Sequence, residues 1–168
     1  MKKKLRVLIA GAGSIGYKEA KVLRNHPLVK VVGIVDNNAQ RRKAASKYVP
    51  TTYSDYETAL TKCECDLVRI ATPPETHHPF ALMALKAGKD VYIEKIMTVR
   101  LKHAKEIVAL AKKLGRKVYV RRNAMYTAVY LKAWKRLKEI GDVRFVHWIE
   151  LIQEYSFWSP YKQTWLKK

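Results

Sequence analysis

The sequence predicts an α/β protein of the Rossmann type, a doubly wound parallel sheet with helices on both faces. Short and almost entirely apolar segments alternate along the chain with segments of helical periodicity, a pattern typical of buried parallel strands. The first apolar segment runs directly into Gly11-Ala12-Gly13-Ser14-Ile15-Gly16, and the second ends at Asp36. This order of strand, glycine loop, helix, strand and acidic residue is the sequence signature of a dinucleotide-binding unit.

The remaining elements follow from the same alternation. The predicted strands are short and apolar, and they span residues 6–10, 31–36, 67–71, 90–93 and 117–120. The predicted helices span residues 14–25, 39–48, 55–62, 79–87, 99–114 and 127–140. Gly88 and Gly115 directly follow two of these helices, and Pro27 follows the first. Glycine and proline are residues at which helices commonly end.

The alternation of short apolar segments with helical segments ends after residue 142. Residues 143–152 predict one long strand, and the aromatic residues that follow have no regular spacing. We therefore expect one domain over residues 1–141, with residues 142–168 as the start of a truncated second domain or an interaction tail. Because a long apolar strand edge pairs readily with another strand, we expect a homodimer or a partner chain to bind through residues 143–165.

The glycine loop predicts where a dinucleotide binds. Gly11 permits the tight turn out of the strand, Gly13 leaves room for a pyrophosphate, and Gly16 lets the following helix pack close to the sheet. The N-terminus of that helix offers free N–H groups to the phosphates, so Ser14 and Ile15 belong to the predicted site.

Asp36 predicts which dinucleotide is bound. It lies 20 residues after Gly16, where a carboxylate can accept hydrogen bonds from both hydroxyl groups of the adenosine ribose. The same charge would repel a 2′-phosphate, so we expect NAD rather than NADP, with Asn37 also in the site. Arg41 and Arg42 lie five and six residues beyond Asp36, in the next predicted helix.

The chain carries a large excess of positive charge, with 34 Lys and Arg against 14 Asp and Glu and a formal net charge of +20. Such a field attracts polyanions. The basic residues are spread over many helices, however, and no nucleic-acid-binding signature accompanies them. We therefore expect a solvated basic surface rather than a nucleic-acid partner. The alternative function is a non-catalytic interaction module that uses this surface and the aromatic C-terminal segment.

Several other classes of site have no support in the sequence. No run of about 18 apolar residues occurs, so we expect no membrane span. The basic N-terminus is too short for a signal peptide, and we expect a cytoplasmic protein. Cys63 and Cys65 match neither a CxxC redox pair nor a zinc site, so we expect ordinary thiols and no metal.

Four segments, in order, resemble the N-terminal domain of the Gfo/Idh/MocA family, which includes glucose–fructose oxidoreductase and inositol dehydrogenase. They are residues 11–16, Asp36, residues 71–74 (Ala-Thr-Pro-Pro) with His77, and Glu94-Lys95. The resemblance covers about residues 5–150. It implies a domain that binds NAD or NADP while a hydride moves between the nicotinamide and a sugar or polyol carbon.

The resemblance also implies roles for residues beyond the glycine loop. Thr72 and Pro73 would lie along the cofactor, His77 near it, and Glu94 beside the nicotinamide ribose. Lys95 would contact the cofactor and, as the candidate catalytic residue, donate a hydrogen bond to the reacting oxygen of the substrate. A cation that ends a parallel strand does point into the ligand crevice of such sheets.

The chain departs from the family after Lys95 and in length. Ile96 stands where the family has a proline that fixes the turn. Family members continue into a second α/β domain with a catalytic D-x-x-x-H histidine, and none of the five histidines here lies in that pattern. A positioned histidine is worth roughly 10²–10⁴-fold in rate. We therefore expect the NAD-binding domain of a sugar- or polyol-type oxidoreductase that is incomplete as a catalyst alone.

Three arginines form the last departure. Arg69 interrupts an apolar strand, where a buried arginine needs a partner or a route to water. Arg121 and Arg122 follow the strand at 117–120. The three could form a cationic crevice for a phosphorylated or nucleotide-linked substrate; alternatively, they are scattered and solvated.

Overall fold

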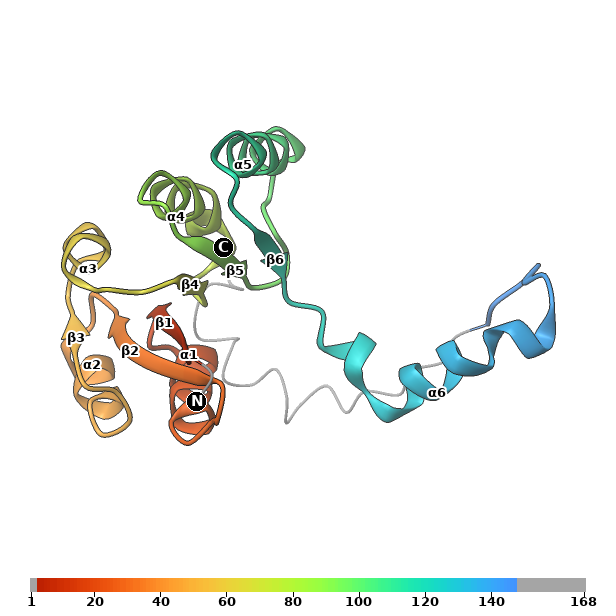
Figure 1. Cartoon of the computed structure of the whole chain (residues 1–168), viewed down its shortest axis with the longest axis horizontal. Helices are drawn as coiled ribbons and strands as arrows, with labels where there is room; N and C mark the ends of the chain where they lie inside the picture. The colour runs from red at the N-terminus through yellow and green to blue at the C-terminus, as the bar shows by residue number, and fades with distance from the viewer. Residues whose placement is uncertain (1–2, 148–168) are drawn as a thin grey trace. The chain divides into compact units, whose positions relative to one another are not determined.

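The computed structural model describes residues 3–147, and the chain divides into two compact units, Met1–Arg121 and Arg122–Lys168. The first unit contains a six-stranded sheet in the order β3-β2-β1-β4-β5-β6 (Figure 1). Every neighbouring pair of strands is parallel. The strand order reverses direction between β1 and β4, as in a Rossmann fold, so the predicted fold class is confirmed.

The strands match the predicted ones closely. They are β1 (Leu5–Ala10), β2 (Val29–Val35), β3 (Thr52–Tyr53), β4 (Leu67–Ile70), β5 (Asp90–Ile93) and β6 (Val118–Val120). Only β3 has no counterpart among the predicted strands, because two residues carry no periodicity. The helices of this unit are α1 (Ser14–Leu23), α2 (Ala39–Ala45), α3 (Tyr56–Lys62), α4 (Pro74–Lys86) and α5 (Leu101–Leu114).

Helix α4 begins at Pro74, so its predicted start at Pro79 is wrong. Pro74 occupies the first helical position, where the missing N–H has no intrahelical partner to lose. Pro73 before it is extended, and Pro79 lies inside the helix. Pro74 and Pro79 are each compatible with the first turn of a helix, and the sequence pattern alone favours Pro79, which is not the start.

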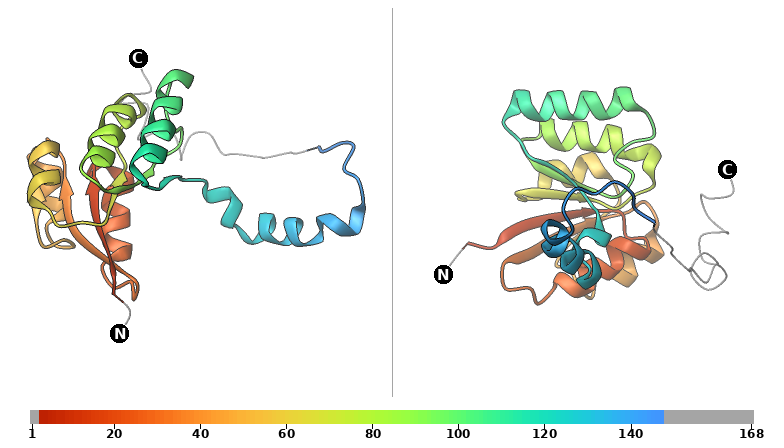
Figure 2. Two further views of the ribbon diagram at one scale, coloured as in Figure 1. Left: turned by 45° about the horizontal axis from the view of Figure 1, so that its top comes forward. Right: turned by 90° about the vertical axis from the view of Figure 1, so that its right-hand side faces the viewer.

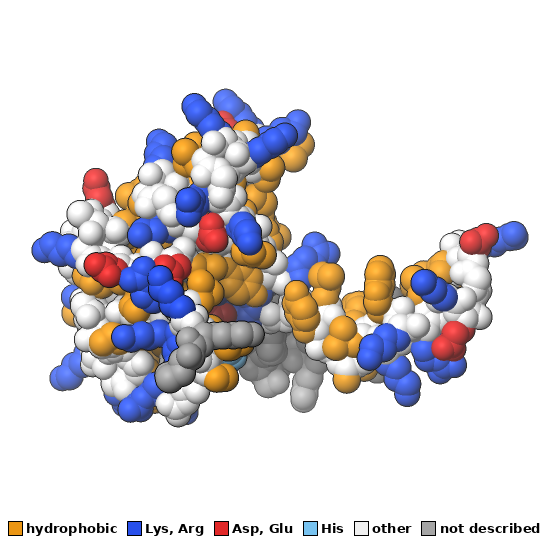
Figure 3. Space-filling model, viewed as in Figure 1, with side chains coloured by type: hydrophobic (Ala, Val, Ile, Leu, Met, Phe, Trp, Pro, Cys, Tyr) orange, Lys and Arg blue, Asp and Glu red, His pale blue; other side chains and the backbone are white. Residues whose placement is uncertain are grey.

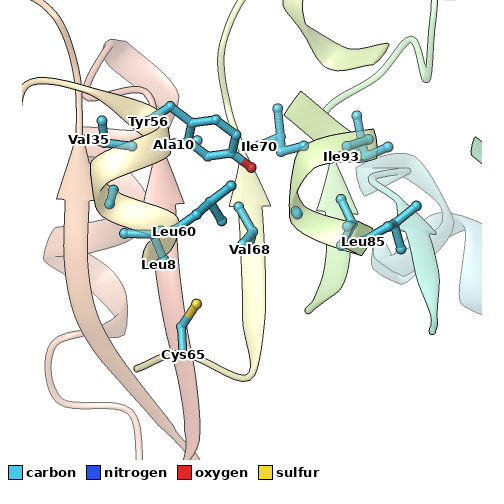
Figure 4. Close-up of a cluster of buried hydrophobic side chains, with 14 of the residues drawn as sticks. Leu8, Ala10, Val35, Tyr56, Leu60, Cys65, Val68, Ile70, Leu85 and Ile93 are labelled. Atoms are coloured by element: carbon cyan, nitrogen blue, oxygen red, sulfur yellow. The ribbon is translucent and has the colours of Figure 1, made fainter. Parts of the chain in front are cut away.

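Helices cover both faces of the sheet (Figure 2). Val7 and Ile9 of β1 pack on the face covered by α1 and α2, whereas Leu8 and Ala10 pack on the face covered by α3, α4 and α5. This alternation follows from the two-residue period of a strand. Figure 4 shows the second cluster, in which Leu60 of α3 and Leu85 of α4 lie against the strands. Each large apolar side chain buried there contributes about 1.5–3 kcal/mol to folding.

The second unit contains the helix predicted over residues 127–140. Helix α6 (Ala128–Arg136) follows the 3₁₀ turn η1 (Asn123–Tyr126) and continues into η2 (Leu137–Ile140). The strand predicted over 143–152 is wrong over 143–147, which have no regular secondary structure, and its remainder lies outside the described residues. A strand forms only beside a hydrogen-bonding partner, which an apolar pattern does not supply. The domain boundary at residue 141 stays a prediction.

The carboxyl ends of the strands in the first unit meet at one edge of the sheet. The glycine loop leaves this edge after β1, Asp36 follows β2, Thr72 follows β4, and Glu94 follows β5. The predicted site residues are therefore brought together by the topology. Over residues 3–147, no helix is long and apolar enough to cross a membrane.

Candidate functional site

The glycine loop between β1 and α1 requires glycine at two positions. Gly11 has φ of +100°, a value that residues with a side chain rarely adopt. Its N–H donates to the carbonyl oxygen of Val35 at 2.7 Å. A Cβ on Gly16 would lie 1.9 Å from the carbonyl oxygen of Gly11. Only glycine therefore allows α1 to begin this close to the turn.

The N-terminus of α1 is open to a ligand. A Cβ on Gly13 would meet no protein atom within 4 Å. Gly13 also provides no side-chain cap, whereas Asn38 and Asp55 cap the starts of α2 and α3. The first N–H groups of a helix have no intrahelical partner, so those of Ser14 and Ile15 can bind phosphate oxygens.

Asp36 lies directly beside this loop. Its Oδ2 accepts the N–H of Ala12 at 2.8 Å, and its Oδ1 accepts the N–H of Asn38 at 2.8 Å. The guanidinium of Arg42 donates to the carbonyl oxygens of Asp36 and Asn37 at 2.7 and 2.9 Å. Hydrogen bonds therefore hold both Asp36 and Asn37 in place. Arg42 contributes two of these bonds, a role that its position in a predicted helix does not reveal.

His77 joins the loops that follow β4 and β5. It is completely buried, with Nε2 2.9 Å from the carbonyl oxygen of Thr72 and Nδ1 2.8 Å from that of Ile96. The tautomer of the ring decides which of these two carbonyl oxygens receives a hydrogen bond. In the same loop, Thr76 Oγ1 lies 2.7 Å from Thr72 Oγ1 and 2.8 Å from the carbonyl oxygen of Pro73. A direct contact of His77 with the cofactor stays a prediction.

The side chains of Lys95 and Glu94 differ in exposure and in the number of contacts that they make. Lys95 is exposed, and its ammonium forms no hydrogen bond or ion pair with any residue in the described range 3–147. Its peptide bond to Ile96 is cis. Glu94, in contrast, accepts hydrogen bonds at Oε1 from Arg69 at 2.5 Å and from Arg121 at 2.9 Å.

The electrostatics of Glu94 follow from those contacts. Burial acts to raise the pKa of Glu94, but the hydrogen bonds and charges of Arg69 and Arg121 outweigh it and lower the pKa. Burial likewise acts to lower the pKa of Arg69, and the carboxylates of Glu19 and Glu94 raise it above its ordinary value. Glu94 and Arg69 therefore both remain charged at neutral pH.

The ion pairs of Arg69 and Arg121 fit neither of the two interpretations, a cationic crevice for a phosphorylated substrate or scattered and solvated arginines. Arg69 is 2% exposed, so it is not solvated, and its charge is paired with Glu19 and Glu94. Arg121 pairs with the same two carboxylates. Neither is therefore an unpaired cation awaiting a phosphorylated substrate. Glu19 is absent from the predicted site, although a buried arginine in a strand signals that some carboxylate must approach it.

The basic side chains and the two cysteines are the remaining candidates for a binding or metal site. On the face of the first unit that Figure 3 shows, Lys and Arg side chains are spread over several elements. Cys63 and Cys65 are free and buried. Within the part of the chain that the structure describes, no three His, Cys, Asp or Glu side chains are placed to hold a metal ion.

Comparison with known proteins gives the family. The family model GFO_IDH_MocA, "Oxidoreductase family, NAD-binding Rossmann fold", matches residues 5–122. The uncharacterized oxidoreductase YdgJ of Escherichia coli K12 is 32% identical over 140 residues, which are 79% of this chain and 40% of YdgJ. Inositol 2-dehydrogenase/D-chiro-inositol 3-dehydrogenase of Lactiplantibacillus plantarum is 31% identical over 117 residues, 67% of this chain and 33% of that enzyme.

A solved structure agrees with the sequence relatives. GenD2 from gentamicin A biosynthesis, in complex with NAD, superposes with a TM-score of 0.79 at 26% identity, over 88% of this chain and 42% of GenD2. The chain thus spans less than half the length of each of these relatives. It belongs to the Gfo/Idh/MocA oxidoreductase family, of which it contains the NAD-binding Rossmann domain.

Proposed function

We propose that this domain binds NAD in preference to NADP, as part of an oxidoreductase that acts on a hydroxyl carbon of a sugar, polyol or related substrate. The observation that carries the proposal is the convergence of the glycine loop, Asp36 and Glu94-Lys95 at the carboxyl edge of one parallel sheet. In such sheets ligands bind outside this edge, where the strand order reverses.

Each part of the site has a role in this proposal. The uncapped N-terminus of α1 holds the pyrophosphate. Asp36 accepts the hydroxyl groups of the adenosine ribose, while Thr72, Pro73 and Glu94 line the nicotinamide half. When bound, NAD supplies the hydride acceptor. The exposed ammonium of Lys95 donates to the substrate oxygen and stabilises negative charge that develops there.

The preference for NAD rests on the charge beside the adenosine ribose. A 2′-phosphate would meet the carboxylate of Asp36, which two backbone N–H groups hold in place. Arg41 could offset this repulsion, but its guanidinium lies 3.9 Å from Asp36 and is half exposed to solvent. Nη1 of Arg42 already donates to the backbone carbonyl oxygens of Asp36 and Asn37. Exposed charges contribute little to binding because water screens them.

Calorimetric titration of the full chain with NADH and NADPH at one ionic strength tests the proposal. We expect NADH to bind more tightly than NADPH. Tighter binding of NADPH contradicts the cofactor preference, and heat from neither ligand contradicts a dinucleotide site altogether.

Self-association is the second part of the proposal. Val143, Phe145 and Val146 are apolar, and over 143–147 the chain pairs with no strand of the described structure. Repulsion between two basic chains is screened beyond about 8 Å at physiological salt. We expect sedimentation to give a dimer for the intact chain and a monomer for a version that ends at Gly141. A monomer in both cases contradicts a role for residues 143–165.

A further inference from the structure

A partly buried network of four charged residues, with Arg69 buried at its centre, joins α1 to β4 and to the ends of β5 and β6. Arg69 donates from Nε and Nη2 to the two carboxylate oxygens of Glu19, at 2.7 and 3.0 Å. Its Nη2 also donates to Glu94. Arg121 donates from Nη1 to Glu19 at 2.7 Å and to Glu94 at 2.9 Å. Two arginines and two glutamates thus balance each other in charge.

Arg69 sits at the centre of this network in a fixed position. Its Nη1 donates to the carbonyl oxygen of Ile70 at 2.7 Å and lies 3.4 Å from that of Tyr92. Its guanidinium carbon lies 4.7 Å from the centre of the Tyr92 ring. In the part of the chain described, no buried side-chain nitrogen or oxygen lacks a partner. Each nitrogen of the Arg69 guanidinium thus has a hydrogen-bond acceptor.

Stability alone is a weak explanation for such a network. Removing two charges from water is costly, and apolar residues of similar volume often stabilise a protein as well as a buried ion pair does. A planar guanidinium does provide one thing that an apolar side chain lacks, the fixed orientation of the carboxylates that it binds.

The carboxylate that is oriented in this way stands next to the candidate catalytic residue. Oε1 of Glu94 accepts from both arginines, and Oε2 lies 3.2 Å from the backbone N–H of Lys95. Both the side chain of Glu94 and the start of the Lys95 loop are thereby held. Glu19 completes the link, because it lies on α1, the helix whose N-terminus faces the predicted pyrophosphate.

We propose that Arg69 and Glu19 are positioning residues that hold Glu94 in the orientation needed to bind the nicotinamide half of NAD. This inference rests on the proposed function. It also separates the two halves of the cofactor, because the adenosine half depends on Asp36 and the glycine loop, which the network does not touch. ADP, which lacks the nicotinamide ribose and the nicotinamide, reports on the adenosine half alone.

The experiment compares NAD and ADP binding by calorimetry for the full chain and for Arg69→Met and Arg69→Lys. We expect both variants to bind NAD about tenfold more weakly, the size of one lost charged hydrogen bond, with the affinity for ADP unchanged. Arg69→Lys keeps the charge but not the fork of donors, so it carries the test if Arg69→Met does not fold. Arg6→Met is the matched control, since Arg6 pairs with Glu64 and Asp66 instead, and it should change neither affinity.

A double-variant cycle shows whether Arg69 acts through Glu94. In a Glu94→Gln background, Arg69→Lys should weaken NAD binding no further. The inference is overturned if the losses of NAD affinity in the two variants are additive. It is also overturned if the Arg69 variants lose affinity for NAD and ADP equally, or if their NAD affinity is unchanged. If the unmodified chain binds neither NAD nor ADP, the proposed function itself fails, and the positioning role fails with it.

Discussion

One carboxylate oxygen of Asp36 accepts the backbone N–H of Ala12 at 2.8 Å, which ties the end of β2 to the glycine loop. The other oxygen accepts the N–H of Asn38 at 2.8 Å. Each carboxylate oxygen has two lone pairs, so each keeps one for a ribose hydroxyl. The acidic residue is therefore oriented before any ligand arrives.

Replacing Asp36 by Ala should weaken NAD binding by about 1–3 kcal/mol, because hydrogen bonds between the ribose and a charged group are lost. NADPH binding should weaken less, since the variant also removes the repulsion of the 2′-phosphate. Calorimetry measures both. Asp55→Ala is the control: it removes the cap of α3 and lowers stability, and it should leave NAD affinity unchanged. Equal losses in the two variants would contradict a ribose contact.

Substitution by Ala should mainly lower the stability of the fold at Gly16 and mainly weaken NAD binding at Gly13. Gly16→Ala places a Cβ 1.9 Å from a backbone oxygen, so we expect a loss of about 1–3 kcal/mol in the free energy of unfolding, or failure to fold. Gly13→Ala meets no protein atom within 4 Å and should cost less than about 1 kcal/mol as a poorer N-cap. It should still weaken NAD binding, because the methyl group enters the space predicted for the pyrophosphate. Thermal melts and calorimetry separate the two effects.

The positions in the fold that the sequence predicts correctly around the candidate site are those set by neighbouring residues. Gly11 and Gly16 are required by one turn, and Asp36 ends the strand that pairs with the strand before that turn. Spacing along the chain is enough to place all three. The parallel sheet then brings the residues after β4 and β5 to the same edge.

The parts that the sequence does not predict depend on contacts between distant residues. Glu19 meets Arg69 across 50 positions and Arg121 across 102. Nothing in the local pattern of α1 distinguishes Glu19 from a solvated glutamate. The strand predicted from residue 143 is wrong over 143–147 for a related reason, since pairing requires a neighbour that lies elsewhere in the chain.

A protein of these 168 residues should show little turnover on inositol, glucose or nucleotide sugars with NAD. Proton transfer by a positioned acid or base is worth roughly 10²–10⁴-fold in rate. The nitrogens of His77 are already occupied by carbonyl oxygens, and His78 bonds to Glu106. Spectrophotometric assay of NADH formation checks this. Robust turnover that disappears in Lys95→Ala would contradict it and show that Lys95 with local groups suffices.

His77→Leu should lower the free energy of unfolding by about 1–3 kcal/mol, because the fully buried ring loses its hydrogen bonding to the loop backbone. The carbonyl oxygens of Thr72 and Ile96 lose their contacts with the ring nitrogens in this variant. His78→Leu is the matched control on the next residue of the same helix. His78 is partly exposed and pairs with Glu106, so its loss should cost less than about 1 kcal/mol. Equal costs in urea titrations would show that His77 does not hold the two loops.

Stability should fall in acid as Asp66 takes up a proton. Hydrogen bonds from the side chain and the backbone N–H of Arg6 lower the pKa of Asp66 to about 2. Because the folded pKa lies below the unfolded one, the ionised carboxylate stabilises the fold fully above about pH 4, and this stabilisation is lost as the pH falls towards 2. The side chain is 33% exposed, so solvent screening reduces the contribution to about 1 kcal/mol.

Urea titrations between pH 5 and pH 2 should therefore give a shallower acid loss for Asp66→Asn than for the unmodified chain. Glu64→Gln is the control, since Glu64 pairs with the same arginine at 3.0 Å but is 90% exposed, and an exposed pair contributes little. Its acid loss should match that of the unmodified chain. If Asp66→Asn and the unmodified chain lose stability in parallel, the Arg6–Asp66 pair does not stabilise the sheet through its charge.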